Sequence, residues 1–75
     1  MNTKNFYFVA AYSDNGSLRY DNCLQSIEGV DHFLLHDMRW SVAKRHGKTP
    51  DEVMIVYHME IAKEEADLFR KEASL

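Results

Sequence analysis

The chain has 75 residues, which is enough for one domain but not for a catalytic domain beside a separate binding domain. Its 9 basic and 12 acidic residues give a formal net charge of −3, so it lacks the positive surface with which general nucleic-acid-binding proteins neutralise phosphates. With 45% hydrophobic and 28% charged residues, the composition is that of a globular protein and excludes a disordered or collagen-like chain.

The first predicted element is a strand over Phe6–Tyr12, a run of mostly aromatic and β-branched residues without a charge. A run that is apolar on both sides is typical of a central strand. Ser13–Gly16 follows with the Asn-Gly pair of a hairpin turn, and Leu18–Leu24 then alternates between apolar and polar residues. We therefore predict a hairpin whose second strand lies at an edge of the sheet.

The type of turn decides which side of the first strand is buried. A two-residue turn at Asn15 and Gly16 would group the apolar side of the second strand, Leu18 and Tyr20, with Tyr7, Val9 and Ala11. A turn with a bulge at Gly16 would group it instead with Phe6, Phe8, Ala10 and Tyr12. We favour the bulged turn because it buries the bulkier set.

From Val30 to His46 the apolar residues recur at the spacing of a helix. The apolar stripe of this helix comprises Val30, Leu34, Leu35, Met38 and Val42. The side roughly opposite carries His32, His36, Arg39, Ala43 and His46. Gly47 stands where a glycine with positive φ commonly ends a helix.

Thr49–Glu52 has the spacing of a helix start, with a capping residue followed by proline. The next residues, Val53–Met59, are strongly β-branched and aromatic, so we predict one short turn and then a third strand. The side of this strand facing the core would carry Val53, Ile55, Tyr57, Met59 and Ile61. The tail, Lys63–Ser74, is predicted to form a second helix whose narrow apolar stripe is mostly alanine.

The predicted order is β-β-α-β-α, in a single small α+β domain that spans residues 1–75. A crossover from the second strand to the third, with the hydrophobic first strand between them, gives a three-stranded, mainly antiparallel sheet of order 2-1-3. The long helix packs on one face, which makes a two-layer sandwich.

The other face of this sheet would also be apolar. With the bulged turn it carries Tyr7, Val9, Ala11, Met54, Val56 and His58. Either the C-terminal helix or a second copy of the chain could cover it, and we favour a homodimer because an alanine stripe covers little area. Trp40 lies off the apolar stripe of the long helix, so it either bridges to the C-terminal helix or anchors an interface.

The sequence offers little that could carry chemistry. Cys23 is the only cysteine, which excludes an intrachain disulfide, and with no secretion signal or membrane-spanning run we expect a cytoplasmic protein. His32 and His36 have the spacing of two metal ligands but need a third, so a small metal-binding protein is only an alternative. Cys23 beside His58 would lack an orienting acid and an oxyanion hole. We predict no cofactor, no metal and no catalytic residue.

Charge is uneven along the chain. Residues 39–48 contain four cations and no acid, whereas residues 51–75 contain three cations and seven acids. The basic patch consists of Arg39, Lys44, Arg45 and Lys48. We predict a small non-enzymatic interaction or regulatory module, of the kind common among bacterial and phage accessory proteins, that binds itself and another protein. The alternative is a nucleic-acid-binding protein that uses the basic patch.

Overall fold

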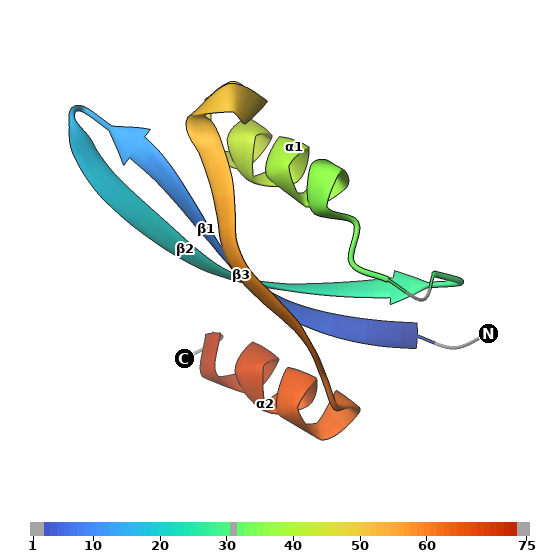
Figure 1. The fold of residues 1–75 in the computed structure, drawn as a ribbon. Coiled ribbons are helices and arrows are strands. Elements are labelled where there is room, and N and C mark those ends of the chain that lie inside the picture. Colours follow the sequence, from blue (N-terminus) through green and yellow to red (C-terminus); the bar gives the residue numbers. More distant parts are fainter. Residues whose placement is uncertain (1–2, 31, 74–75) are drawn as a thin grey trace.

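A computed structural model describes residues 3–30 and 32–73 of the chain (Figure 1). The elements follow in the order β1 (Thr3–Asp14), β2 (Ser17–Glu28), α1 (Leu35–His46), a 3-10 turn (Pro50–Glu52), β3 (Val53–Ile61) and α2 (Lys63–Ala73). The strands form one sheet in the order β2-β1-β3, with β1 antiparallel to both neighbours. The predicted α+β topology, β-β-α-β-α with sheet order 2-1-3, is therefore confirmed.

The turn between β1 and β2 has two residues and no bulge. Asn15 and Gly16 both have positive φ, 52° and 82°, and Asp14 pairs directly with Ser17. Two consecutive positive φ angles define a type I′ turn, whose twist matches that of the flanking strands, and Asn-Gly is its preferred sequence. The predicted bulged turn is wrong, and Leu18 and Tyr20 consequently share a face with Ala11 and not with Ala10.

The irregularity lies instead in β3. Val9 pairs with Tyr57 while Ala10 pairs with Ile55, so Val56 is an extra residue opposite β1. A bulge of this kind changes the side on which every later residue of the strand lies. Val53 and Ile55 face the core as predicted, but beyond the bulge the residues predicted to face it, Tyr57, Met59 and Ile61, lie on the other face.

Helix α1 covers one face of the sheet and encloses the core. Phe8, Ala10 and Cys23 from the hairpin meet the helix, and the members of the core cluster contributed by α1 and β3 are Met38, Val42, Ala43 and Val53. Val42 is 0% exposed, as expected for a member of the predicted stripe. Ala43, predicted on the opposite side, is also buried, because the helix turns the side that carries Met38, Val42 and Ala43 toward the strands.

Helix α1 begins at Leu35 and not at Val30. Gly29, at φ 75°, ends the preceding strand, and Phe33 stays outside the helix. The Phe33 ring packs against Phe6 and Phe8 with centroid distances of 5.6 and 5.3 Å. The chain buries this ring against the sheet at the place where the sequence predicts the first turn of the helix. The helix ends as predicted, with Gly47 in the left-handed conformation at φ 67°.

Helix α2 lies against the face opposite α1 (Figure 1). Ala66 of α2 is fully buried, and the Phe69 ring meets Tyr7 edge-on at 6.0 Å. Because Tyr7 and Phe8 are neighbours in β1, they point to opposite faces of the sheet, Tyr7 toward α2 and Phe8 toward α1. The C-terminal helix therefore covers part of the second face, and the rest of that face stays uncovered.

Candidate interaction surface

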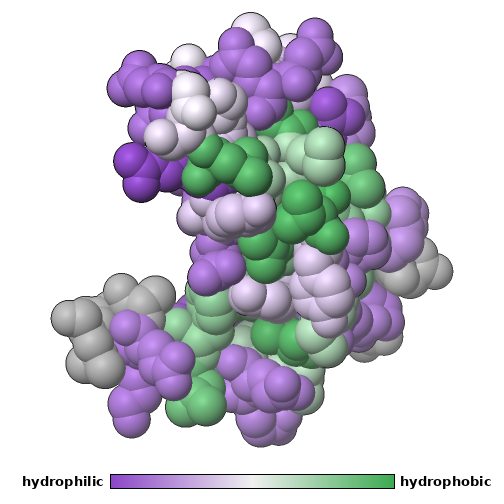
Figure 2. Space-filling view, turned by 60° about the vertical axis from the view of Figure 1, so that its left-hand side comes forward, coloured by the Kyte–Doolittle hydropathy of each residue, from purple (hydrophilic) through white to green (hydrophobic). Residues whose placement is uncertain are grey.

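The uncovered part of the second face lies toward the β1–β2 turn. Ala11 of β1 is flanked by Tyr20 of β2 and Met54 of β3, and both large side chains stand on the side of the sheet away from α1. Exposed fractions are 62% for Leu18 and Tyr20, 64% for Met54 and 49% for Tyr57. We call Leu18, Tyr20, Met54 and Tyr57 the open-face patch. The space-filling view from the hairpin side shows several hydrophobic side chains, with paler residues between them, on the sheet above α2 (Figure 2).

The structure places the predicted interface residues in different environments. Tyr7 and Val9 lie on the face away from α1, with Tyr7 beneath α2, and Met54 lies in the open-face patch. Val56 is the extra residue of the bulge and is 46% exposed. The predicted position of His58 is wrong: it pairs with Phe8 on the α1 face, and its ring stacks on Phe33 at 4.4 Å. The bulge is the cause, since it changes the side of every residue after Val56.

The predicted bulged turn places Leu18 and Tyr20 on the covered side of the sheet. The sequence shows the apolar alternation of β2, but the face on which it lies depends on the turn. The signal that could have found these residues is the Asn15-Gly16 pair, because Asn-Gly strongly favours a two-residue type I′ turn. With that turn, both side chains belong to the face away from Phe8.

Trp40 projects from the outer side of α1. Its side chain is 54% exposed, and its indole Nε1 donates a hydrogen bond to Nε2 of His36 at 2.9 Å. Helices α1 and α2 lie on opposite faces of the sheet, so the first of the two alternatives for Trp40, a bridge to the C-terminal helix, is excluded. Trp40 lines a hollow of about 450 Å³ together with Ser41, Lys44 and Lys48 and with Asp37.

The basic patch is mostly engaged within the molecule. Arg39 donates from Nε to the Val53 carbonyl at 3.1 Å and from Nη2 to the Pro50 carbonyl at 3.0 Å, so it fastens α1 to the start of β3. Arg45 forms an ion pair with Asp21 at 2.8 Å, and Lys48 lies 3.9 Å from Asp14. Lys44 is exposed. Three of the four cations of the basic patch thus have partners within the chain, and the Arg45 side chain is still 52% exposed.

Asp21 is the centre of a polar cluster that ties the end of α1 to β2. Its Oδ2 accepts a hydrogen bond from Arg45 and lies 3.0 Å from Nε2 of His46, whose ring stacks on Tyr12. Partial burial alone would raise the pKa of Asp21, but the His46 hydrogen bond and the charge of Arg45 outweigh it and hold the pKa below its usual value. Asp21 therefore stays ionised, and its contacts hold the end of α1 against β2.

Cys23 lies beside this cluster but is not arranged as a nucleophile. It is 4% exposed, and burial raises the pKa of its thiol despite a contact from Arg45 to Sγ at 3.6 Å. A buried thiol of raised pKa carries little thiolate, the reactive form. His32 lies before α1 and His36 inside it, and within the described residues no three side chains of His, Cys, Asp or Glu are grouped to hold a metal ion.

Comparison with known proteins adds no relative: no family model, curated protein or solved structure matches the chain. None of the helices described is long and apolar enough to cross a membrane. Any functional assignment therefore depends on the geometry of the surface itself.

Proposed function

We propose that this chain is a non-enzymatic protein-interaction module that forms a homodimer through the open-face patch. The observation that carries the proposal is the set of four large apolar side chains, Leu18, Tyr20, Met54 and Tyr57, which are 49–64% exposed on one uncovered sheet face. Monomeric proteins rarely leave large apolar side chains grouped in this way, and such groups mark interaction sites.

The size of the patch supports a second copy as its occupant. The four side chains expose roughly 500 Å² in one copy, so two copies facing each other bury about 1,000 Å², the lower limit for a specific interface. None of the four carries a formal charge, although Arg39, Asp51 and Glu52 line the same hollow as Leu18, Tyr20 and Met54. An interface of this size is consistent with a dissociation constant in the micromolar range.

The test is the mass in solution over a wide range of concentrations, measured by sedimentation equilibrium. In about 1 M salt, which screens contacts between charges, we expect the mass to rise from 8.8 kDa toward twice that value as the concentration reaches about 500 µM. Leu18→Ser should weaken the dimer by about 10-fold, because it removes an apolar side chain from the patch.

Leu68→Ser is the matched control, since Leu68 is 57% exposed but lies on α2, outside the hollow that Leu18, Tyr20 and Met54 line. It should leave the dissociation constant unchanged. A wild-type chain that stays at 8.8 kDa throughout, or equal effects of the two variants, would contradict the proposal.

A further inference from the structure

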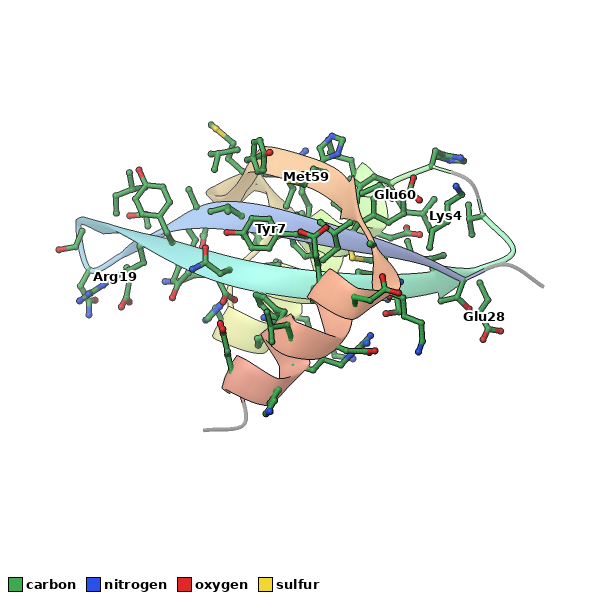
Figure 3. All side chains as sticks on the ribbon, turned by 90° about the horizontal axis from the view of Figure 1, so that it is seen from below. Lys4, Tyr7, Arg19, Glu28, Met59 and Glu60 are labelled. Atoms are coloured by element: carbon green, nitrogen blue, oxygen red, sulfur yellow. The ribbon has the colours of Figure 1, made fainter. Side chains whose placement is uncertain are left out.

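A second apolar surface lies between α2 and β3, next to the open-face patch but separate from it. Met59 and Ile61 of β3 and Leu68 and Phe69 of α2 line a groove of about 290 Å³, and Glu65 and Glu72 stand at the same groove. Met59 is 43% exposed and Leu68 57%. We call these six residues the acidic groove. Figure 3 shows Met59 on the β3 side of this region, with α2 in front of the sheet.

The acids of the groove keep their charge uncompensated. The ion pairs along α2 are made by Asp67, with Lys63 at 3.5 Å and with Arg70 at 3.7 Å. Among the described residues, neither Glu65 nor Glu72 has an ion pair. The groove thus combines an apolar lining with two unpaired negative charges, which suits an apolar anchor next to a cation.

Such an anchor is present on the opposite side of the same molecule. The Trp40 ring is exposed on α1, and Lys44, one helical turn further along, lines the same hollow. A tryptophan that enters an apolar site usually needs a partner for its indole N–H. Here His36 already accepts that hydrogen bond, so the ring can enter an apolar groove without losing one.

We propose that Trp40 of one copy docks into the acidic groove of another copy, with Lys44 beside Glu65 and Glu72. Asp37 and the contact of Lys48 with Asp14 reduce the positive charge around Trp40, so Lys44 is the main cation of the contact. This proposal rests on the proposed self-association and adds a second contact to it. Because α1 and α2 lie on opposite faces of the sheet, the contact is head-to-tail and can repeat from copy to copy (Figure 1).

The two contacts differ in their response to salt. The four side chains of the open-face patch carry no formal charge, so its dimer should depend on ionic strength much less than a contact between opposite charges. The contact of Trp40 with the acidic groove pairs opposite charges and should weaken as salt screens them. At low salt we expect masses above that of a dimer, and at about 1 M salt a dimer only.

Trp40 fluorescence tests the contact directly, because Trp40 is the only tryptophan of the chain. When the concentration of the wild-type chain is raised at low salt, the emission of Trp40 should shift to shorter wavelength. The quenching of Trp40 by acrylamide should fall. Leu68→Ser should weaken this change by about 10-fold, and Glu72→Lys by about 5-fold. The double variant Lys44→Glu/Glu72→Lys should recover part of the loss, because the charges are exchanged.

Glu28→Lys is the matched control, since it makes the same charge change at the end of β2, outside the groove (Figure 3). It should leave the Trp40 signal as in the wild type. A concentration-dependent mass without any change in Trp40 emission would overturn this inference and leave the open-face dimer standing. A fluorescence change that is as large in Leu68→Ser and Glu72→Lys as in the wild type would also overturn it. A chain that remains monomeric would refute both proposals.

Discussion

The contact between α1 and the sheet can be tested by Val42→Ala. Val42 is 0% exposed and belongs to the core cluster with Phe8 and Val53. Removing two buried methyl groups costs about 1.6 kcal/mol of transfer free energy, at ~0.8 kcal/mol each. If ~25 Å³ of the vacated space stays open, the cavity adds roughly 0.6 kcal/mol, at ~24 cal/mol per Å³.

Helix propensity offsets part of this cost, because alanine is favoured over valine inside a helix by about 0.5 kcal/mol. The expected net loss is about 1.5–2 kcal/mol. For a domain of this size the melting temperature should fall by roughly 6–15 °C. A chain of 75 residues is expected to have an unfolding free energy of about 4–11 kcal/mol, so the variant should still fold.

The assay is thermal and urea unfolding followed by far-ultraviolet circular dichroism. Val56→Ala is the control, because it deletes the same two methyl groups from a side chain that is 46% exposed. At concentrations where the chain is monomeric, it should change the unfolding free energy by less than about 0.5 kcal/mol. An equal loss in both variants, or no loss in Val42→Ala, would refute the placement of α1 on the sheet.

Three further predictions concern the turn, the Asp21 cluster and Arg39. Gly16→Ala should cost about 1 kcal/mol, because φ is 82° and the added Cβ meets no atom within 4 Å, whereas Gly16→Asn should cost less in the same urea titration. The folded-state pKa of Asp21 is lowered, so its contribution is present above pH ~4 and is lost as the pH falls through that pKa. Asp21→Asn should therefore destabilise the chain by about 1 kcal/mol at pH 7, with a difference from the wild type that shrinks toward pH 3; a constant difference would contradict this. Arg39→Lys should lower the urea midpoint, with a loss of about 1 kcal/mol, because an ammonium group cannot reproduce two guanidinium hydrogen bonds to the Val53 and Pro50 carbonyls. An unchanged midpoint would show that these bonds add no stability.

Local sequence patterns determined the elements and their order. The uncharged run in β1, the β-branched run in β3 and the helical spacing before Gly47 each reflect a backbone preference or a period that neighbouring residues set by themselves. The hydrophobic character of β1 also placed it in the middle of the sheet. These features are local or depend on simple burial, so the sequence was sufficient for them.

The face on which each residue of β3 lies was decided only by tertiary structure. One bulge at Val56 moves Tyr57 and Met59 to the face away from α1 and brings His58 against Phe33. Side chains alternate with a period of two along a strand, so a shift of one residue reverses every later assignment. Tertiary structure also decided which cations of the basic patch have partners within the molecule, since Arg39 and Arg45 contact residues distant in sequence. Such partners are set by the packing of α1 across the sheet, which no local pattern specifies.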